Sequence, residues 1–224
     1  MSLGSLREAV GTQSQVPAIV DNSFEQGCLY ILTEAYKRLH KNYIRNWHEN
    51  MYTARLIVHM EQIRDEEDIN LLIDPECYQY FQEILAEDNN PDTAPRIDIR
   101  LKGGWANRDV YYGMEAKILV ETDWQTRDAS KLRIRYIKTG IAHFVQGEYS
   151  PVIAKSCMVG YVAQGCPQQI VSKINSYLDS KNRSSEKIEN RQTINDCPDC
   201  YTSHHIRMTD GQAIRLQHIM LDFT

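Results

Sequence analysis

Three residues on two predicted strands carry side chains that could hold a divalent cation. Glu115 and Lys117 are two residues apart, so in a strand they project to the same face. A charged pair within an apolar strand is costly unless it finds partners or a metal. Asp98 would lie beside Glu115 if the preceding strand pairs with this one, and a divalent cation is the usual resolution for two adjacent carboxylates.

The chemistry that suits this set is phosphodiester hydrolysis. Carboxylate oxygens hold Mg²⁺, the cation polarises the phosphate and activates water, and a lysine positions that water or offsets developing charge. We therefore predict Mg²⁺ as the cofactor, with Mn²⁺ as a substitute, at Asp98 and Glu115, and Lys117 as the residue that orients the water. The alternatives are a salt bridge between Glu115 and Lys117 on an exposed strand, and an Asp98 that only ends a strand or caps a turn.

The hydrophobic pattern predicts the elements that position these residues. Strict alternation over residues 96–102 indicates a strand with one buried face, and residues 110–120 indicate a second, antiparallel strand rich in Val, Ile and Tyr. Helical spacing of apolar residues predicts two helices within 24–63. The other predicted elements are helices at 75–85, 129–145 and 167–178, a loop at 88–92, and strands at 158–163 and 214–223.

The order of these residues resembles the signature of the restriction-endonuclease-like superfamily, often written PD-(D/E)xK. Its two parts are similar to Pro95-Arg96-Ile97-Asp98 and to Glu115-Ala116-Lys117, although the Pro-Asp dipeptide itself is absent. Residues 49–56 resemble the first helix of many members, in which a glutamate completes the metal shell. The resemblance covers roughly residues 49–163.

The resemblance adds Glu49 to the metal ligands, together with the backbone carbonyl of Ala116. The alternative for Glu49 is a surface glutamate on an amphipathic helix. The implied fold is α/β with a restriction-endonuclease-like three-layer core, a central mixed sheet flanked by helices, here with an N-terminal helical extension. The implied activity is that of a Mg²⁺-dependent DNA endonuclease acting in restriction or phage defence. The alternative from another class is a catalytically silent module of the same fold that binds nucleic acid or a partner protein.

Basic residues are concentrated in one part of an acidic chain. The net charge of −5 argues against a nonspecific nucleic-acid coat. Residues 127–155, however, hold six Lys and Arg residues against two acidic ones, which suits a face that meets DNA. The predicted nucleic-acid contacts are Arg133, Tyr136 and Lys138 on the helix at 129–145, and Lys102 on the face of Asp98. The alternative for each is a solvated basic face.

Length and composition favour one domain. We expect a flexible leader at 1–24, a single domain at 25–224 and a polar loop at about 179–202. No apolar run approaches the roughly 20 residues that cross a bilayer, so no membrane partner is expected. Six scattered cysteines and the lack of a secretory signal indicate the cytoplasm. A homodimer would suit cleavage of both strands, and an operon-encoded partner protein could supply target recognition.

Cys197, Cys200, His204 and His205 form a second group with chemical potential. Their spacing is compatible with tetrahedral Zn²⁺. A strong zinc signature would show two separated pairs, so free cysteines in a loop are favoured over a structural zinc site. The two histidines could instead approach the substrate, or they could be structural or exposed.

Overall fold

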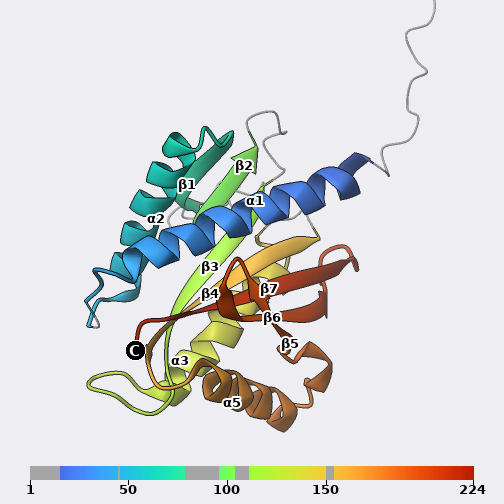
Figure 1. Ribbon diagram of the computed structural model, residues 1–224. Helices are drawn as coiled ribbons and strands as arrows, with labels where there is room; N and C mark the ends of the chain where they lie inside the picture. Colours follow the sequence, from blue (N-terminus) through green and yellow to red (C-terminus); the bar gives the residue numbers. More distant parts are fainter. Residues whose placement is uncertain (1–15, 45, 79–95, 104–110, 150–153) are drawn as a thin grey trace, which may run out of the picture.

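A seven-stranded mixed sheet organises the part of the chain that the structure describes (Figure 1). The structure is a computed structural model that describes residues 16–44, 46–78, 96–103, 111–149 and 154–224. The strands are β1 Leu71–Tyr78, β2 Arg96–Gly103, β3 Tyr112–Val120, β4 Lys155–Gln164, β5 Glu189–Ile194, β6 Cys197–Ile206 and β7 Ala213–Asp222. Their order across the sheet is β1-β2-β3-β4-β7-β6-β5. The neighbours β3, β4 and β7 run parallel, and the other neighbouring pairs are antiparallel.

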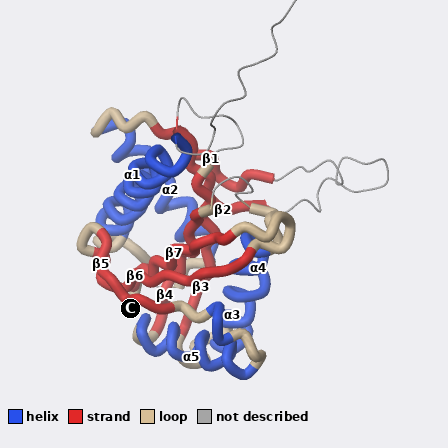
Figure 2. Tube along the Cα trace, turned by 90° about the vertical axis from the view of Figure 1, so that its right-hand side faces the viewer, coloured by secondary structure: helices blue, strands red, loops and turns tan. Residues whose placement is uncertain are grey.

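Helices lie on both faces of this sheet, as Figure 2 shows from the side. The helices of one face are α1 Val16–Leu39 and α2 Glu49–Glu66. The other face carries α3 Ala129–Tyr136, the π-helix η2 Ile137–Ile141, α4 Ala142–Val145 and α5 Pro167–Ser180. The 3-10 helix η3 Ser184–Glu186 precedes β5. The predicted α/β class, a mixed sheet flanked by helices, is therefore confirmed.

Strand β3 supplies side chains to the cores on both sides of the sheet. Ala116 and Ile118 pack into the core under α1 and α2. Leu119 packs into the core under α3 and α5. Because side chains alternate along a strand, Glu115 and Lys117 share the α3 side with Leu119, and both are buried.

The elements nearest the motif agree with the sequence pattern. Strands β2 and β3 occupy the two predicted segments and pair antiparallel, as expected. The predicted helix at 129–145 is present but kinked: the segment Ile137–Ile141 has π-type hydrogen bonding, and Thr139 within it has a non-helical backbone with φ −121° and ψ 15°. Asp128 caps its start by accepting a hydrogen bond from the Lys131 N–H at 2.9 Å. The predictions for β4, α5 and β7 are also confirmed, within a few residues at each end.

Two predicted segments are wrong because the edge strands of the sheet accept residues that are rare in central strands, namely a proline in β1 and a run of polar residues in β5. Residues 75–78 belong to β1 and not to a helix; 79–85 and the loop at 88–92 lie outside the described residues. Pro75 is compatible with β1 because an edge strand needs a ladder on only one side. The polar loop at 179–202 instead contains η3, β5 and half of β6. Strand β5 is polar because it lies exposed at the opposite edge.

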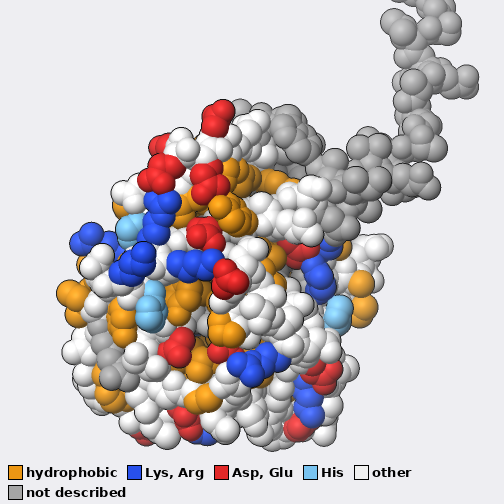
Figure 3. All heavy atoms as spheres, in the orientation of Figure 1, with side chains coloured by type: hydrophobic (Ala, Val, Ile, Leu, Met, Phe, Trp, Pro, Cys, Tyr) orange, Lys and Arg blue, Asp and Glu red, His pale blue; other side chains and the backbone are white. Residues whose placement is uncertain are grey.

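Part of the predicted leader is helical. Helix α1 begins at Val16, so residues 16–24 belong to a helix. Residues 1–15 lie outside the described residues. On the face formed by α1 and α2, basic and acidic side chains are interspersed and not separated into one patch (Figure 3). Arg38, for example, pairs with Glu66 at 2.7 Å. Within the described ranges, no helix is long and apolar enough to cross a membrane.

Candidate active site

Two carboxylates take the place of a neighbouring strand at the open edge of β3. The β2–β3 ladder runs from Leu101 paired with Tyr112 to Ile99 paired with Met114. Beyond it, the Ala116 N–H donates to Asp98 Oδ2 at 2.7 Å. The Ile118 N–H donates to Glu49 Oε2 at 2.8 Å. Buried amides require partners, so these two acids hold β2 and α2 against β3 at the point where the strands separate.

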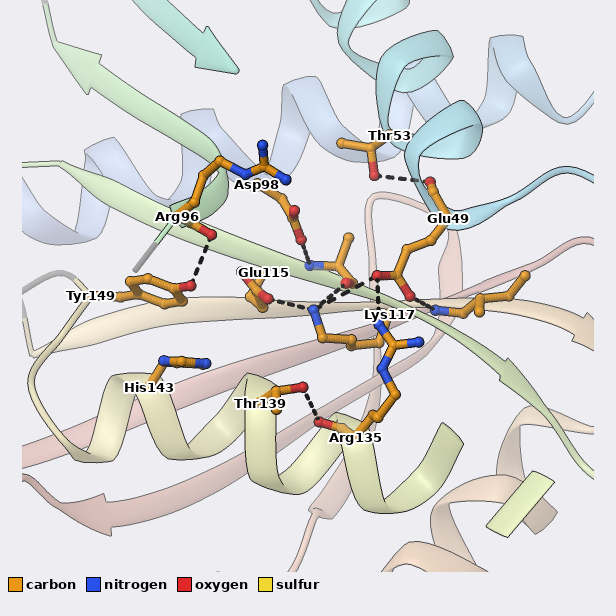
Figure 4. A network of polar contacts seen from close by, with 12 residues as sticks. Glu49, Thr53, Arg96, Asp98, Glu115, Lys117, Arg135, Thr139, His143 and Tyr149 are labelled. Atoms are coloured by element: carbon orange, nitrogen blue, oxygen red, sulfur yellow. Dashed lines mark hydrogen bonds and ion pairs between the residues drawn. The ribbon is translucent and has the colours of Figure 1, made fainter. Parts of the chain in front are cut away.

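Lys117 brings the predicted residues into one cluster (Figure 4). Its Nζ forms an ion pair with Glu115 Oε1, and this contact is the closest of the group. The same Nζ donates to the carbonyl oxygen of Ala116 at 3.0 Å. Glu49 Oε1 lies 3.8 Å from it. The structure therefore brings together Asp98, Glu115, Ala116, Lys117 and Glu49, as the sequence predicts.

Burial shapes the electrostatics of this cluster. Burial and, next, the charge of Asp98 raise the pKa of Glu115 from 4.5 to about 8, outweighing the opposite effect of Lys117. Burial also raises the pKa of Asp98. Burial lowers the pKa of Lys117, but the carboxylates, Glu115 first, raise it more, so that its pKa lies above the ordinary value. Lys117 is therefore charged at neutral pH, whereas Glu115 and Asp98 keep their protons to a higher pH than is usual for these side chains.

The donor set of the cluster fits a hard cation. Glu115 Oε2 is buried and has no hydrogen-bond partner among the described residues. An unsatisfied buried carboxylate oxygen is costly, and Mg²⁺ prefers such oxygens as ligands. The group is not a complete site, however, because no three His, Cys, Asp or Glu side chains in the described ranges are placed to hold a metal. The Lys117 amine contacts Glu115 at the centre of the cluster, where a cation would compete with it.

Helical residues that the sequence analysis missed face the same cluster. Arg135 Nη2 lies 3.4 Å from Glu49 Oε1. Thr139 and His143 follow at intervals of four residues and lie on the helix side of the cluster, as Figure 4 shows. Tyr149, which stacks on His143 with ring centroids 5.0 Å apart, donates to the carbonyl oxygen of Arg96 at 2.8 Å. The regular spacing of four could have revealed this helix face, but the predicted contacts were Arg133, Tyr136 and Lys138, chosen for their closeness on a basic helix.

The four predicted nucleic-acid contacts have different outcomes. Lys102 Nζ lies 2.9 Å from Asp74 Oδ2, so it already has an acidic partner. Arg133 Nη1 donates to the carbonyl oxygen of Glu121 at 3.2 Å, just beyond the end of β3. Lys138 is exposed. These three contacts remain predictions. The fourth, Tyr136, is wrong because its side chain is fully buried.

Tyr136 instead begins a buried chain of hydrogen bonds. Its hydroxyl lies 2.8 Å from His218 Nδ1. Ser203 Oγ lies 2.7 Å from His218 Nε2 and 2.7 Å from His205 Nε2. His205 Nδ1 then contacts Glu186 Oε2 at 3.2 Å. Burial lowers the pKa of His218 to about 3, so this ring is neutral near pH 7, and one of its two nitrogens donates a hydrogen bond while the other accepts one.

Replacing Tyr136 by phenylalanine is expected to lower the free energy of unfolding by about 1–3 kcal/mol, because His218 Nδ1 would lose its hydrogen-bond partner inside the core. Urea denaturation followed by circular dichroism measures this. The matched control is Tyr30→Phe, whose hydroxyl contacts Glu67 at the surface at 3.0 Å and which should change stability by less than about 0.5 kcal/mol. Equal effects of the two substitutions would contradict a stabilising role for the buried chain.

The candidate zinc ligands do not converge. Cys197 and Cys200 are free thiols buried in the core. His204 and His205 lie on opposite faces of β6, the first exposed and the second buried in the chain just described. No zinc-binding group that includes these residues occurs in the described ranges. These cysteines lie in strand β6 and not in a loop.

An open pocket of about 630 Å³ adjoins the cluster at Glu49. Its walls come from the start of α2, from β3 and from the segment that leads into α3. The residues that line it are Asn46, His48, Glu49, Asn50, Ile118, Gln125, Thr126, Arg127, Asp128, Lys131, Leu132 and Arg135. The Glu49 end of the cluster is therefore accessible from a hollow large enough for a small ligand.

Comparison with known proteins finds no relative. No protein-family model, curated protein or solved structure matches the chain. The resemblance to the restriction-endonuclease-like superfamily therefore stays a prediction that depends on the residues and their arrangement.

Proposed function

We propose that this chain is a Mg²⁺-dependent nuclease with a restriction-endonuclease-like core, which hydrolyses phosphodiester bonds in DNA and serves in restriction or phage defence. One observation carries the proposal: Asp98, Glu115, Lys117 and Glu49, from three elements, meet at the open edge of β3. Metal-assisted phosphodiester hydrolysis requires carboxylate ligands for the cation, a lysine that acts on water or phosphate, and a pocket for the substrate.

The carboxylates have defined roles in this proposal. Asp98, Glu115 and Glu49 would hold Mg²⁺ together with the carbonyl oxygen of Ala116 after the Lys117 amine leaves Glu115 and Ala116, because in the present arrangement no three acidic side chains of the described residues are placed to hold a metal. A cation bound there would polarise the scissile phosphate and favour the ionisation of water. Glu115 must release its proton first, because its pKa is raised to about 8.

Two basic side chains would act on the substrate. The Lys117 amine keeps its charge, since its pKa lies above the ordinary value. It would orient the attacking water or offset charge on the phosphate. Arg135, 53% exposed and 3.4 Å from Glu49, would contact the phosphate from the helix side.

A catalytically silent nucleic-acid-binding or partner-binding module of the same fold is the second candidate. The observation that favours it is the ion pair between Lys117 and Glu115, which already compensates one of the acids. The incomplete metal-ligand group among the described residues points the same way. Such a module would bind DNA equally well with and without divalent cations.

A cleavage assay separates the two functions. Supercoiled plasmid and single-stranded DNA are incubated with the purified chain in Mg²⁺, in Mn²⁺ or in EDTA. The nuclease is expected to cut in either cation and not in EDTA. Binding of DNA without cutting in any cation would favour the silent module.

A further inference from the structure

The pocket beside Glu49 combines features that suit a nucleotide. Arg127, Lys131 and Arg135 supply positive charge. Ile118 and Leu132, which are 6% and 9% exposed, form a small apolar floor against which one face of a base can pack. The amide side chains of the pocket, which can read the polar edge of a base, are Asn46, Asn50 and Gln125.

Arg127 carries an unsatisfied donor in this pocket. Its Nη2 donates to the carbonyl oxygen of Trp47 at 2.7 Å, and its Cζ lies 5.1 Å from the ring centroid of Trp124. Its Nη1 is buried and has no hydrogen-bond partner among the residues that the structure describes. A buried charged donor without an acceptor is costly, so an anionic group is the natural ligand.

The acidic residues of the pocket are occupied elsewhere. Asp128 accepts from the Lys131 N–H at 2.9 Å and pairs with Lys131 Nζ at 3.5 Å. Glu49 accepts from the Ile118 N–H at 2.8 Å. Each acid is also paired with one of the pocket's cations, Asp128 with Lys131 and Glu49 with Arg135 at 3.4 Å, so among the described residues Arg127 is the lining cation without an acidic partner.

We propose that this pocket holds one unpaired nucleotide of the substrate, next to the scissile phosphate, with a phosphate on Arg127 and the base against Ile118 and Leu132. A base in a duplex is stacked and paired, so it can enter a pocket only after it leaves the stack. The substrate class is therefore DNA with a single-stranded segment. This inference depends on the proposed nuclease function and narrows it.

The test measures binding in EDTA, so that it needs no cleavage. Fluorescence anisotropy compares a labelled single strand, the blunt duplex of the same sequence and that duplex with a short unpaired overhang. The wild-type chain is expected to bind the single strand and the overhang about ten-fold more tightly than the blunt duplex, and Arg127→Gln is expected to remove this preference, as loss of one charge-assisted hydrogen bond implies.

Two further variants keep the test decisive. Lys131→Gln replaces a side chain that is 82% exposed, so it leaves the fold intact and should weaken the same preference if Arg127→Gln fails to fold. Lys181→Gln removes an exposed charge outside the pocket lining and should leave the preference unchanged. Equal affinity for blunt and single-stranded DNA, or a preference that survives loss of the pocket cations, would overturn the inference.

The cleavage assay distinguishes the two possible failures. A wild-type chain that cuts blunt and single-stranded DNA equally, with no dependence on Arg127, keeps the nuclease function and loses the nucleotide pocket. A preference for unpaired DNA that depends on Arg127, together with no cutting in any cation, keeps the pocket and removes the nuclease function.

Discussion

Glu115→Gln is expected to lower Mg²⁺-dependent cleavage about 1,000-fold or more, because catalytic side chains that act as a unit have effects of this size when one is removed. Glutamine has nearly the same shape but cannot supply an anionic ligand. The fold should remain, since the neutral side chain ends the repulsion between Glu115 and Asp98, which contributes to the raised pKa. Plasmid cleavage gives the rate, and thermal unfolding at pH 8 gives the stability.

Lys117→Ala is the partner experiment, and its effect on stability should differ. Cleavage should again be lost. At pH values above about 8, where Glu115 is ionised, removing the amine leaves this buried carboxylate without the cation that pairs with it, and breaking a buried ion pair costs about 3–5 kcal/mol. The double variant Glu115→Gln with Lys117→Ala should recover part of this stability and none of the activity.

A matched control uses an acid outside the cluster. Glu67 is exposed, so Glu67→Gln should cut DNA at the wild-type rate. Wild-type cleavage by both Glu115→Gln and Lys117→Ala would remove the nuclease assignment, because no other acid and lysine share a buried face of β3.

The core of the site could be predicted because its signals are local. Glu115 and Lys117 share a face through the two-residue period of a strand. Asp98 lies on the preceding strand, and a short connection made antiparallel pairing the expected arrangement. Glu49 is different: its hydrogen bond to the Ile118 N–H spans 69 residues, and only the resemblance to a known family pointed to it.

The sheet edges could not be predicted in this way. Strand β5 has an exposed polar sequence because it is the edge strand of the sheet, so its residues carry no hydrophobic period. In β1, Pro75 favoured a helix start by local preference, whereas pairing with Ile99 of β2 determined the actual conformation. Tertiary pairing decided both segments.

Charge was a poor guide to the helix face. Arg133, Arg135 and Lys138 look equivalent in the sequence, but only Arg135 faces the acidic cluster. Tyr136, next to it, turns into the core toward His218. The rotation of a helix depends on the apolar residues that it buries, and the π turn over Ile137–Ile141 shifts it further.

Binding of Mg²⁺ or Mn²⁺ is expected to release about one proton at pH 7, and cleavage at a low fixed Mg²⁺ concentration is expected to rise about ten-fold per pH unit up to about pH 8. The folded chain retains a proton on Glu115 at pH 7 because its pKa is raised to about 8. A cation must displace that proton to reach the carboxylate. Titration calorimetry in two buffers of different ionisation enthalpy counts the protons released.

The same raised pKa fixes the sign of the stability change with pH. The unfolded chain loses the Glu115 proton near the ordinary pKa of 4.5 and the folded chain near 8, so the free energy of unfolding should fall with rising pH in this window. The slope should reach about 1.4 kcal/mol per pH unit without a cation and flatten with Mg²⁺ present. Urea denaturation at pH 5 and pH 8 measures it, with Glu115→Gln as the control that lacks the contribution of this carboxyl group. The prediction fails if cation binding releases no proton and if stability and cleavage rate are constant between pH 6 and pH 8. In that case the cation does not displace a proton from Glu115.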